Sequence, residues 1–337
     1  MTPSVKHNRI EHPFAQYVRI LGKGKTGTRS LSRAEARDAF SMIMRGQVEP
    51  LQLGAFLMLL RVKEETGEEL AGFVEACRET MLAPPQDLGA DLDWSSYAGK
   101  RHQHPWYILA ILLLSEAGFR VFIHGSDGHT AGRLYTEQAF IALGLPVADN
   151  WLEVGRQLDS ERLSYLSLHH FCQPLNEILQ LRSLLGLRSP VNTLARLLNP
   201  LRAPCALQSI FHPAYAQLHH DAGCLLGQSR ALVFKGDSGE IEIKPQADTR
   251  LVYLTDQEKQ ELSLKRSIAQ RVTSVDQPSV EAIRQLWRAE SVDDYGLDAT
   301  LATTAVALAL LTPGITLPAA REKAGQLWQD RDKARLR

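Results

Sequence analysis

Cysteine is scarce in this sequence and is never clustered. Only four cysteines occur among the 337 residues, and none belongs to a C-x-x-C pair. They are Cys77, Cys172, Cys205 and Cys224. Zinc sites and disulfide frameworks are normally built from closely spaced cysteines, so we expect neither a metal site nor disulfides here.

Long apolar segments are missing as well. The N-terminal stretch "MTPSVKHNRIEHP" lacks the apolar core of a signal peptide. The longest apolar runs, such as "WYILAILLL", are far shorter than the ~20 residues that a membrane-spanning helix needs. The sequence therefore predicts a cytoplasmic protein with no membrane partner.

Net charge is absent too, because 38 lysines and arginines balance 38 aspartates and glutamates. Attraction to an acidic polymer would have to come from a local patch of basic side chains. Residues 1–37 contain such a patch, in which eight basic residues are opposed only by Glu11 and Glu35. The eight are Lys6, Arg9, Arg19, Lys23, Lys25, Arg29, Arg33 and Arg37.

Within this patch, Gly22–Gly27 ("GKGKTG") matches the G-x-G-x-x-G pattern of a dinucleotide-binding loop. A true fingerprint follows a strand, whereas helical patterns flank this segment on both sides and Ser32 with Glu35 forms a capping box. No G-K-[ST] ending completes a P-loop either. We therefore predict an exposed loop between helices, which is either merely solvated or contacts many phosphates. The contacting side chains would be Lys23, Lys25, Arg29 and Arg33.

The rest of the chain divides into two parts. Residues 1–85 show helical patterns only, and the proline-rich segment "APPQDLGADLD" follows them. From residue 86 to 337, strand and helix patterns alternate, which is typical of a mostly parallel sheet covered by helices. We predict a small all-helical domain, 1–85, and a larger α/β domain, 86–337, with helices from about 173–198 packing onto the first.

A family resemblance supports this division. The block from "LSRAEARDAF" to "ELAGFVEA", residues 31–76, resembles the helical domain of anthranilate phosphoribosyltransferases and pyrimidine nucleoside phosphorylases. The similarity continues in the same order through "FIHGSD", "LRSLLGLRSPVNTLARLLNP" and "RALVFKGDSG". It implies the nucleoside phosphorylase/phosphoribosyltransferase fold over most of the chain.

The resemblance weakens at the site where catalytic members bind phosphoribosyl pyrophosphate. Their G-T-G-G-D-G loop offers backbone N–H groups to the pyrophosphate, but the matching Ser95–Lys100 reads "SSYAGK". A hydroxyl-bearing N-x-S-T motif becomes "PWYI", and a K-H-G-N turn becomes "IHGS". Where an Asp-Glu pair would hold magnesium, this chain has Ile241 and Glu242. The residues of the altered donor site are Ser95, Ser96, Gly99, His124, Gly125, Ser126 and Glu242.

These departures resemble the non-biosynthetic, YbiB-type branch of TrpD-like proteins. That branch implies a homodimer formed through the helical domain, sequence-independent binding of single- or double-stranded DNA or RNA, and no cofactor. Four further basic side chains would extend the basic loop into a groove: Lys100, Arg101, Arg182 and Arg188. Arg182 and Arg188 could instead compensate a helix dipole.

The alternative is an active glycosyltransferase whose donor site is altered in shape. Only this second interpretation requires Mg²⁺ and phosphoribosyl pyrophosphate. Asp237 and Glu242 would then be the candidate carboxylates for the metal.

Overall fold

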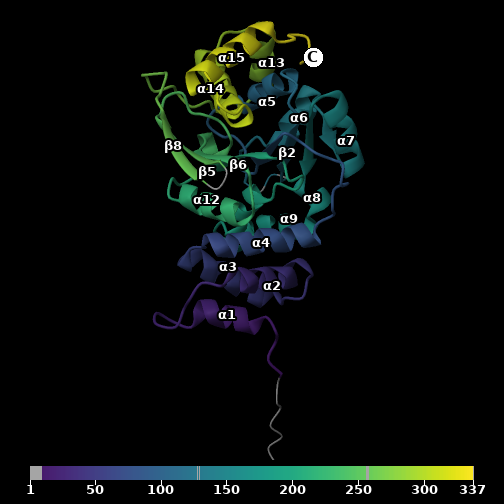
Figure 1. Ribbon diagram of the computed structural model, residues 1–337, viewed down its shortest axis with the longest axis vertical. Helices are drawn as coiled ribbons and strands as arrows, with labels where there is room; N and C mark the ends of the chain where they lie inside the picture. Colours follow the sequence, from purple (N-terminus) through teal and green to yellow (C-terminus); the bar gives the residue numbers. More distant parts are fainter. Residues whose placement is uncertain (1–9, 127, 129, 256–257, 337) are drawn as a thin grey trace, which may run out of the picture.

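A computed structural model describes residues 10–126, 128, 130–255 and 258–336 (Figure 1). Four helices form one end of the molecule, and the α/β domain forms the other (Figure 1). The predicted capping box begins the second helix, because the Ser32 hydroxyl accepts from the Glu35 N–H and the Glu35 carboxylate accepts from the Ser32 N–H. The four helices are α1 (Ala15–Gly22), α2 (Arg33–Met44), α3 (Pro50–Lys63) and α4 (Gly67–Thr80).

An eight-stranded sheet forms the centre of the α/β domain, in the order β3-β4-β2-β1-β5-β6-β7-β8. The strands from β3 to β6 in this order are parallel, while β7 and β8 are antiparallel to their neighbours. This confirms the predicted fold class. The strands are β1 (Leu92–Ser96), β2 (Val121–Gly125), β3 (Val147–Ala148), β4 (Leu163–Ser167), β5 (Cys205–Ile210), β6 (Arg230–Lys235), β7 (Thr249–Thr255) and β8 (Glu258–Leu264).

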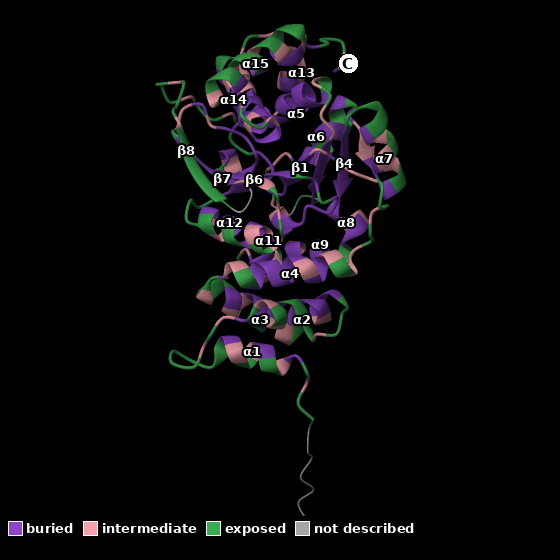
Figure 2. Ribbon diagram, in the orientation of Figure 1, coloured by how far each residue is buried: buried purple, intermediate pink, exposed green. Residues whose placement is uncertain are grey.

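Helices cover both faces of this sheet, and Figure 2 shows its central strands as buried. On one face lie α5 (Tyr107–Glu116), α6 (Thr136–Leu143), α13 (Val280–Arg288), α14 (Asp294–Leu311) and α15 (Leu317–Asp330). The remaining helices are α7 (Trp151–Ser160), α8 (Leu168–Phe171), α9 (Gln173–Gln180), α10 (Arg182–Leu185), α11 (Val191–Leu194) and α12 (Tyr215–Leu225). Among the described helices, none is long and apolar enough to cross a membrane.

The core of the helical domain continues into the α/β domain. Leu70 and Phe73 of α4 belong to the same buried cluster as Leu175 of α9 and Leu194 of α11. The Arg78 guanidinium also donates to the carbonyl of Leu198 over 2.7 Å. Apolar packing and hydrogen bonds therefore both connect the two domains.

Helix α3 leaves apolar side chains uncovered on its outer side. Leu51 is 89 % exposed and Val62 is 85 % exposed, although the sequence of this helix is apolar nearly all round. The predicted homodimer through the helical domain would bury them, and it stays a prediction.

If α3 forms the dimer contact, the double substitution Leu51→Asp and Val62→Asp should convert a dimer into a monomer, because two carboxylates would be desolvated in the interface. Light scattering coupled to gel filtration at micromolar concentrations would measure the mass. Val292→Asp is a matched control, since Val292 is 90 % exposed outside this helix. A monomeric wild-type chain would refute the predicted dimer.

Candidate functional site

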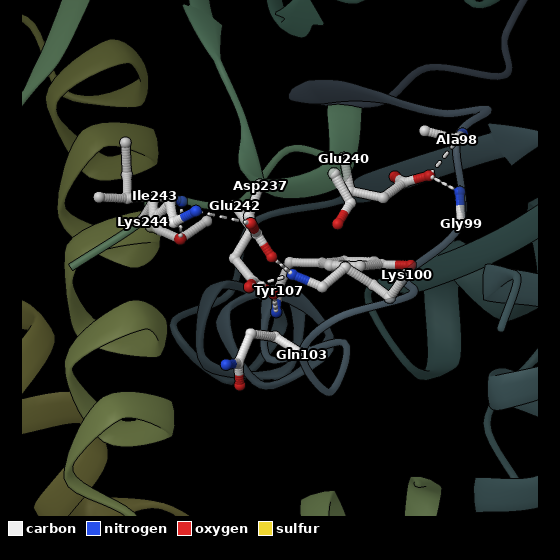
Figure 3. Close-up of polar contacts among 12 residues, drawn as sticks. Ala98, Gly99, Lys100, Gln103, Tyr107, Asp237, Glu240, Glu242, Ile243 and Lys244 are labelled. Carbon is white, nitrogen blue, oxygen red and sulfur yellow. Dashed lines mark hydrogen bonds and ion pairs between the residues drawn. The ribbon is translucent and has the colours of Figure 1, made fainter. Parts of the chain in front are cut away.

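The segment Ser95–Lys100, which corresponds to the pyrophosphate loop of catalytic family members, is occupied by the chain's own Glu240. One oxygen of its carboxylate accepts from the backbone N–H groups of Ala98 (2.6 Å) and Gly99 (2.5 Å), and the other accepts from the Ser96 hydroxyl (2.6 Å) (Figure 3). Glu240 is fully buried. An acidic side chain therefore takes the place of a phosphate group on these donors.

Gly99 is the one glycine kept in this segment, and its backbone explains why. Its φ is +67°, and a Cβ there would come within 3.2 Å of the Leu134 carbonyl oxygen. The turn thus depends on glycine even though no pyrophosphate needs to approach it.

Lys100 does not belong to an exposed groove. Its side chain is fully buried, and its ammonium forms ion pairs with Asp237 and with Glu242 Oε1 (2.5 Å to the latter) (Figure 3). The second Glu242 oxygen accepts from the Tyr107 N–H (2.8 Å) at the start of α5. Since a buried, paired ammonium cannot reach a nucleic-acid phosphate, the prediction for Lys100 was wrong.

Burial and charge act in opposite directions on the two carboxyl groups beside Lys100. Burial raises the pKa of Glu242 to about 7, although the ammonium of Lys100 acts to lower it. Burial is also the largest single influence on Asp237 and acts to raise its pKa, but the charge and hydrogen bond of Lys100, with the charges of Lys244 and His102, together hold the pKa below its usual value. The three groups therefore form a tightly coupled buried network.

These residues do not fit a magnesium site. Asp237 and Glu242 both direct an oxygen at the Lys100 ammonium, so a cation already lies between the two candidate carboxylates. Ile241 is fully buried in the apolar core. Among the described residues there is no cluster of three or more His, Cys, Asp or Glu side chains that could hold a metal ion.

The altered K-H-G-N turn is structural as well. His124 is buried, with Nδ1 2.7 Å from the Tyr97 hydroxyl and Nε2 3.3 Å from Asp93 Oδ2. A Cβ at Gly125 would lie 2.3 Å from the Ser96 carbonyl oxygen, so only glycine fits. All seven predicted donor-site residues are buried: Ser95, Ser96, Gly99, His124, Gly125, Ser126 and Glu242.

The predicted basic loop is only partly available for phosphates. Lys23 and Lys25 are exposed, and they form no ion pair with any described residue. The Arg29 guanidinium forms two hydrogen bonds with the Glu35 carboxylate (2.7 and 2.6 Å), and Arg33 pairs with Glu75. Arg29 and Arg33 would therefore have to exchange a carboxylate for a phosphate. Lys6 and Arg9 lie outside the described residues.

Arg182 lies near Arg188, and Arg188 lines a cleft between the two domains, while the basic loop lies elsewhere. Helix α1, which leads into that loop, is the helix farthest from the sheet (Figure 1). Arg188 lines the cleft with Arg61 of α3 and with Arg196. Arg101 is exposed on the loop before α5 and does not line this cleft.

The charges in this cleft are only partly balanced by carboxylates, because burial lowers the pKa of Arg196 while the nearby charge of Glu240 acts to raise it. Burial and then the nearby guanidiniums of Arg182, Arg133 and Arg196 lower the pKa of Arg188 to about 10. Arg133 donates to the carbonyls of residues 98, 99 and 238, and Arg182 donates to the Thr130 hydroxyl. Among the described residues, none of the four arginines forms an ion pair. Hydrogen bonds to neutral acceptors do not neutralise the guanidinium charges. An anion entering the cleft would therefore reduce the repulsion among the arginines.

Sequence reasoning identified Arg182 and Arg188 but missed Arg133 and Arg196. Arg196 lies eight positions after Arg188, within the segment already noted for its resemblance to the family. Its position in the sequence does not tell whether Arg196 lines a cleft or lies in solvent.

The chain matches two parts of one known family. Residues 16–81 match the helical bundle domain of the glycosyl transferase family, and residues 108–330 match its a/b domain. The chain belongs to this family.

The relatives of this chain include a protein described as uncharacterized and several enzymes. The chain is 32% identical to the uncharacterized protein YbiB of Escherichia coli, over 69% of this chain and 73% of that protein. It is also 32% identical to the anthranilate phosphoribosyltransferase of Methylocella silvestris, over 70% and 67% of the two chains.

Solved structures show the same fold. The Saccharomyces cerevisiae anthranilate phosphoribosyltransferase in complex with PRPP and Mg superposes with a TM-score of 0.80 at 18% identity, covering 97% of this chain and 96% of that one. The enzyme from Thermus thermophilus gives 0.72 at 21% identity, covering 95% and 99%. At such identities the likeness concerns the fold alone.

Proposed function

We propose that this chain binds nucleic acid without sequence preference, with the arginine-lined cleft as the main contact. The observation that carries the proposal is the gathering of Arg133, Arg182 and Arg196 around Arg188 without an ion pair among the described residues, with Arg188 and Arg196 lining the cleft. Arginine side chains contacting phosphates supply affinity that does not depend on base sequence. Lys23 and Lys25 would add a second, separate contact.

The altered donor loop supports binding over phosphoribosyl transfer. Transfer from phosphoribosyl pyrophosphate needs free donors for the pyrophosphate and a place for the metal ion. Here Glu240 already accepts from the loop donors, and Lys100 already pairs with both carboxylates. A donor could bind in the same manner only after Glu240 had moved out of the loop.

Transferase activity with an altered donor site is the second candidate, and the relatives favour it. The relatives from Methylocella silvestris, Methylorubrum populi and Desulfosudis oleivorans are named as anthranilate phosphoribosyltransferases. By kinship alone, transfer is therefore the better supported function. In that case the cleft arginines would bind the phosphate groups of a donor that does not use the closed loop.

Binding of labelled oligonucleotides at several salt concentrations tests the proposal. Affinity should fall steeply with salt, and Arg182→Ala and Arg188→Ala should each reduce the slope of log K against log[salt] by about 0.7–0.9, the value for one phosphate contact. Charge reversal of Lys23 and Lys25 should flatten the slope further if the loop takes part. Lys323→Ala, on exposed α15 surface, removes one charge elsewhere and is the control.

Two results would decide against nucleic-acid binding. One is absent or salt-insensitive binding by the wild-type chain. The other is the absence of oligonucleotide binding combined with micromolar binding of phosphoribosyl pyrophosphate and Mg²⁺ in isothermal titration. That combination would favour the transferase candidate.

A further inference from the structure

Phe211, directly after β5, is a large apolar side chain that stays 48 % exposed. Most phenylalanines of this chain are fully buried, so Phe211 differs from them. The carboxyl ends of parallel strands are the edge at which α/β proteins bind ligands. The position of Phe211 therefore points to a role in binding.

Two basic cavities meet at this ring. Phe211 lines the cleft that holds Arg61, Arg188 and Arg196, and it also lines a neighbouring cavity of about 700 Å³. Basic side chains around that second cavity include Arg133, Lys235, Lys244 and Arg271, and they outnumber the two aspartates that also line it, Asp237 and Asp248. An exposed aromatic ring is thus flanked on both sides by groups suited to phosphates.

The ring is held in place by its surroundings. The Arg188 guanidinium lies over it, 5.8 Å from the ring centroid, and His212 makes an edge contact at 5.1 Å. Gly239 lies beside it, since a Cβ there would be at an ordinary van der Waals distance of 3.6 Å from the ring. A positioned ring loses little conformational freedom on binding, which favours stacking with a flat ligand.

We propose that Phe211 is a stacking platform for an unpaired base, so that the cleft prefers single-stranded to double-stranded nucleic acid. The inference rests on the proposed nucleic-acid binding and names its substrate class. Aromatic rings between basic side chains are the usual way to bind single strands, because every base has a face that can stack. In a duplex both faces of each base are already stacked, so this ring gains nothing there.

Phe211→Ala should weaken binding of a labelled oligothymidylate by about 5- to 100-fold. Its salt slope should not change, since no charge is lost. Binding of a duplex of equal length should change little, and Phe211→Trp should retain single-strand affinity. Leu262→Ala is the matched control, because Leu262 is 47 % exposed on β8. Equal melting temperatures would show that the variants fold.

The outcomes separate the two ideas. If the wild-type chain binds neither single strands nor duplexes, the proposed function fails and the stacking platform fails with it. If binding is salt-dependent and Arg188→Ala flattens its slope, yet Phe211→Ala binds single strands as tightly as wild type, only the stacking platform is overturned. Equal wild-type affinity for single strands and duplexes would also overturn it.

Discussion

Lys100→Met is expected to lower the free energy of unfolding by about 3–5 kcal/mol, the usual cost of removing one partner from a buried ion pair. The side chain of methionine fills a similar volume, so lost packing contributes little. What remains is Asp237 and Glu242, both buried, with no ammonium between them. Urea unfolding would measure the loss.

The loss should depend on pH with a definite sign. In the wild type the pKa of Glu242 is about 7 against an ordinary 4.5, so the folded chain keeps a proton that the unfolded chain releases. That contribution is complete below pH 4.5 and is lost as pH rises through about 7. Removal of Lys100 raises this pKa further, because the ammonium no longer favours the carboxylate. The deficit of Lys100→Met should therefore be smallest near pH 4.5 and largest above about 7.

A surface lysine provides the control for this result. Lys265 is 77% exposed and pairs with Asp248 over 2.9 Å. Lys265→Met should change stability by no more than about 0.5 kcal/mol, since exposed ion pairs contribute little. Equal losses in the two variants would contradict the role given to Lys100.

The Lys100 network also shows why part of the site was beyond sequence reasoning. The motif "GKRHQH" has several basic residues and no acidic one, so it predicts an exposed basic segment. The two carboxylates that pair with Lys100 belong to Asp237 and Glu242, which lie 137 and 142 residues further along the chain. They come from "GDSGEIEI", whose last four residues form neither a helix nor a strand. Only the tertiary fold brings these segments together.

The same limit applies to the basic loop. Arg33 is paired by Glu75, which lies 42 positions away on α4. A local count of charges cannot include such a partner. Fold class, in contrast, follows from features that are local along the chain, namely the helical block followed by alternating strands and helices. Those features were enough to predict the mostly parallel sheet, whereas the changed donor loop was inferred from the family resemblance.

Phe211 is a third case, because the exposure of its side chain could not be predicted from the sequence. In "SIFHPAY" a phenylalanine after an apolar strand is ordinarily a core residue. Its exposure arises because β5 lies at the middle of the sheet and ends at the cleft. Strand order, which the sequence pattern leaves open, decides whether such a side chain meets the core or the solvent.

Glu240→Ala is expected to open the altered donor loop to anions. In the wild type the Glu240 carboxylate satisfies the N–H groups of Ala98 and Gly99 and the Ser96 hydroxyl. Its removal should cost about 1–3 kcal/mol for each buried donor that is left without an acceptor. Added pyrophosphate should restore stability, by about 2.7 kcal/mol at a concentration one hundred times its dissociation constant.

Thermal unfolding with and without pyrophosphate would test this, and Glu240→Gln separates charge from shape. The glutamine amide has nearly the same size and keeps one acceptor oxygen, so this variant should lose less stability and respond less to pyrophosphate. Wild type should not respond at this loop, because its own carboxylate competes from within the same chain at high effective concentration. If pyrophosphate stabilises wild type as strongly as Glu240→Ala, the carboxylate does not close the loop. The family's donor site would then be usable in this chain, and phosphoribosyl transfer would become the better explanation of its fold.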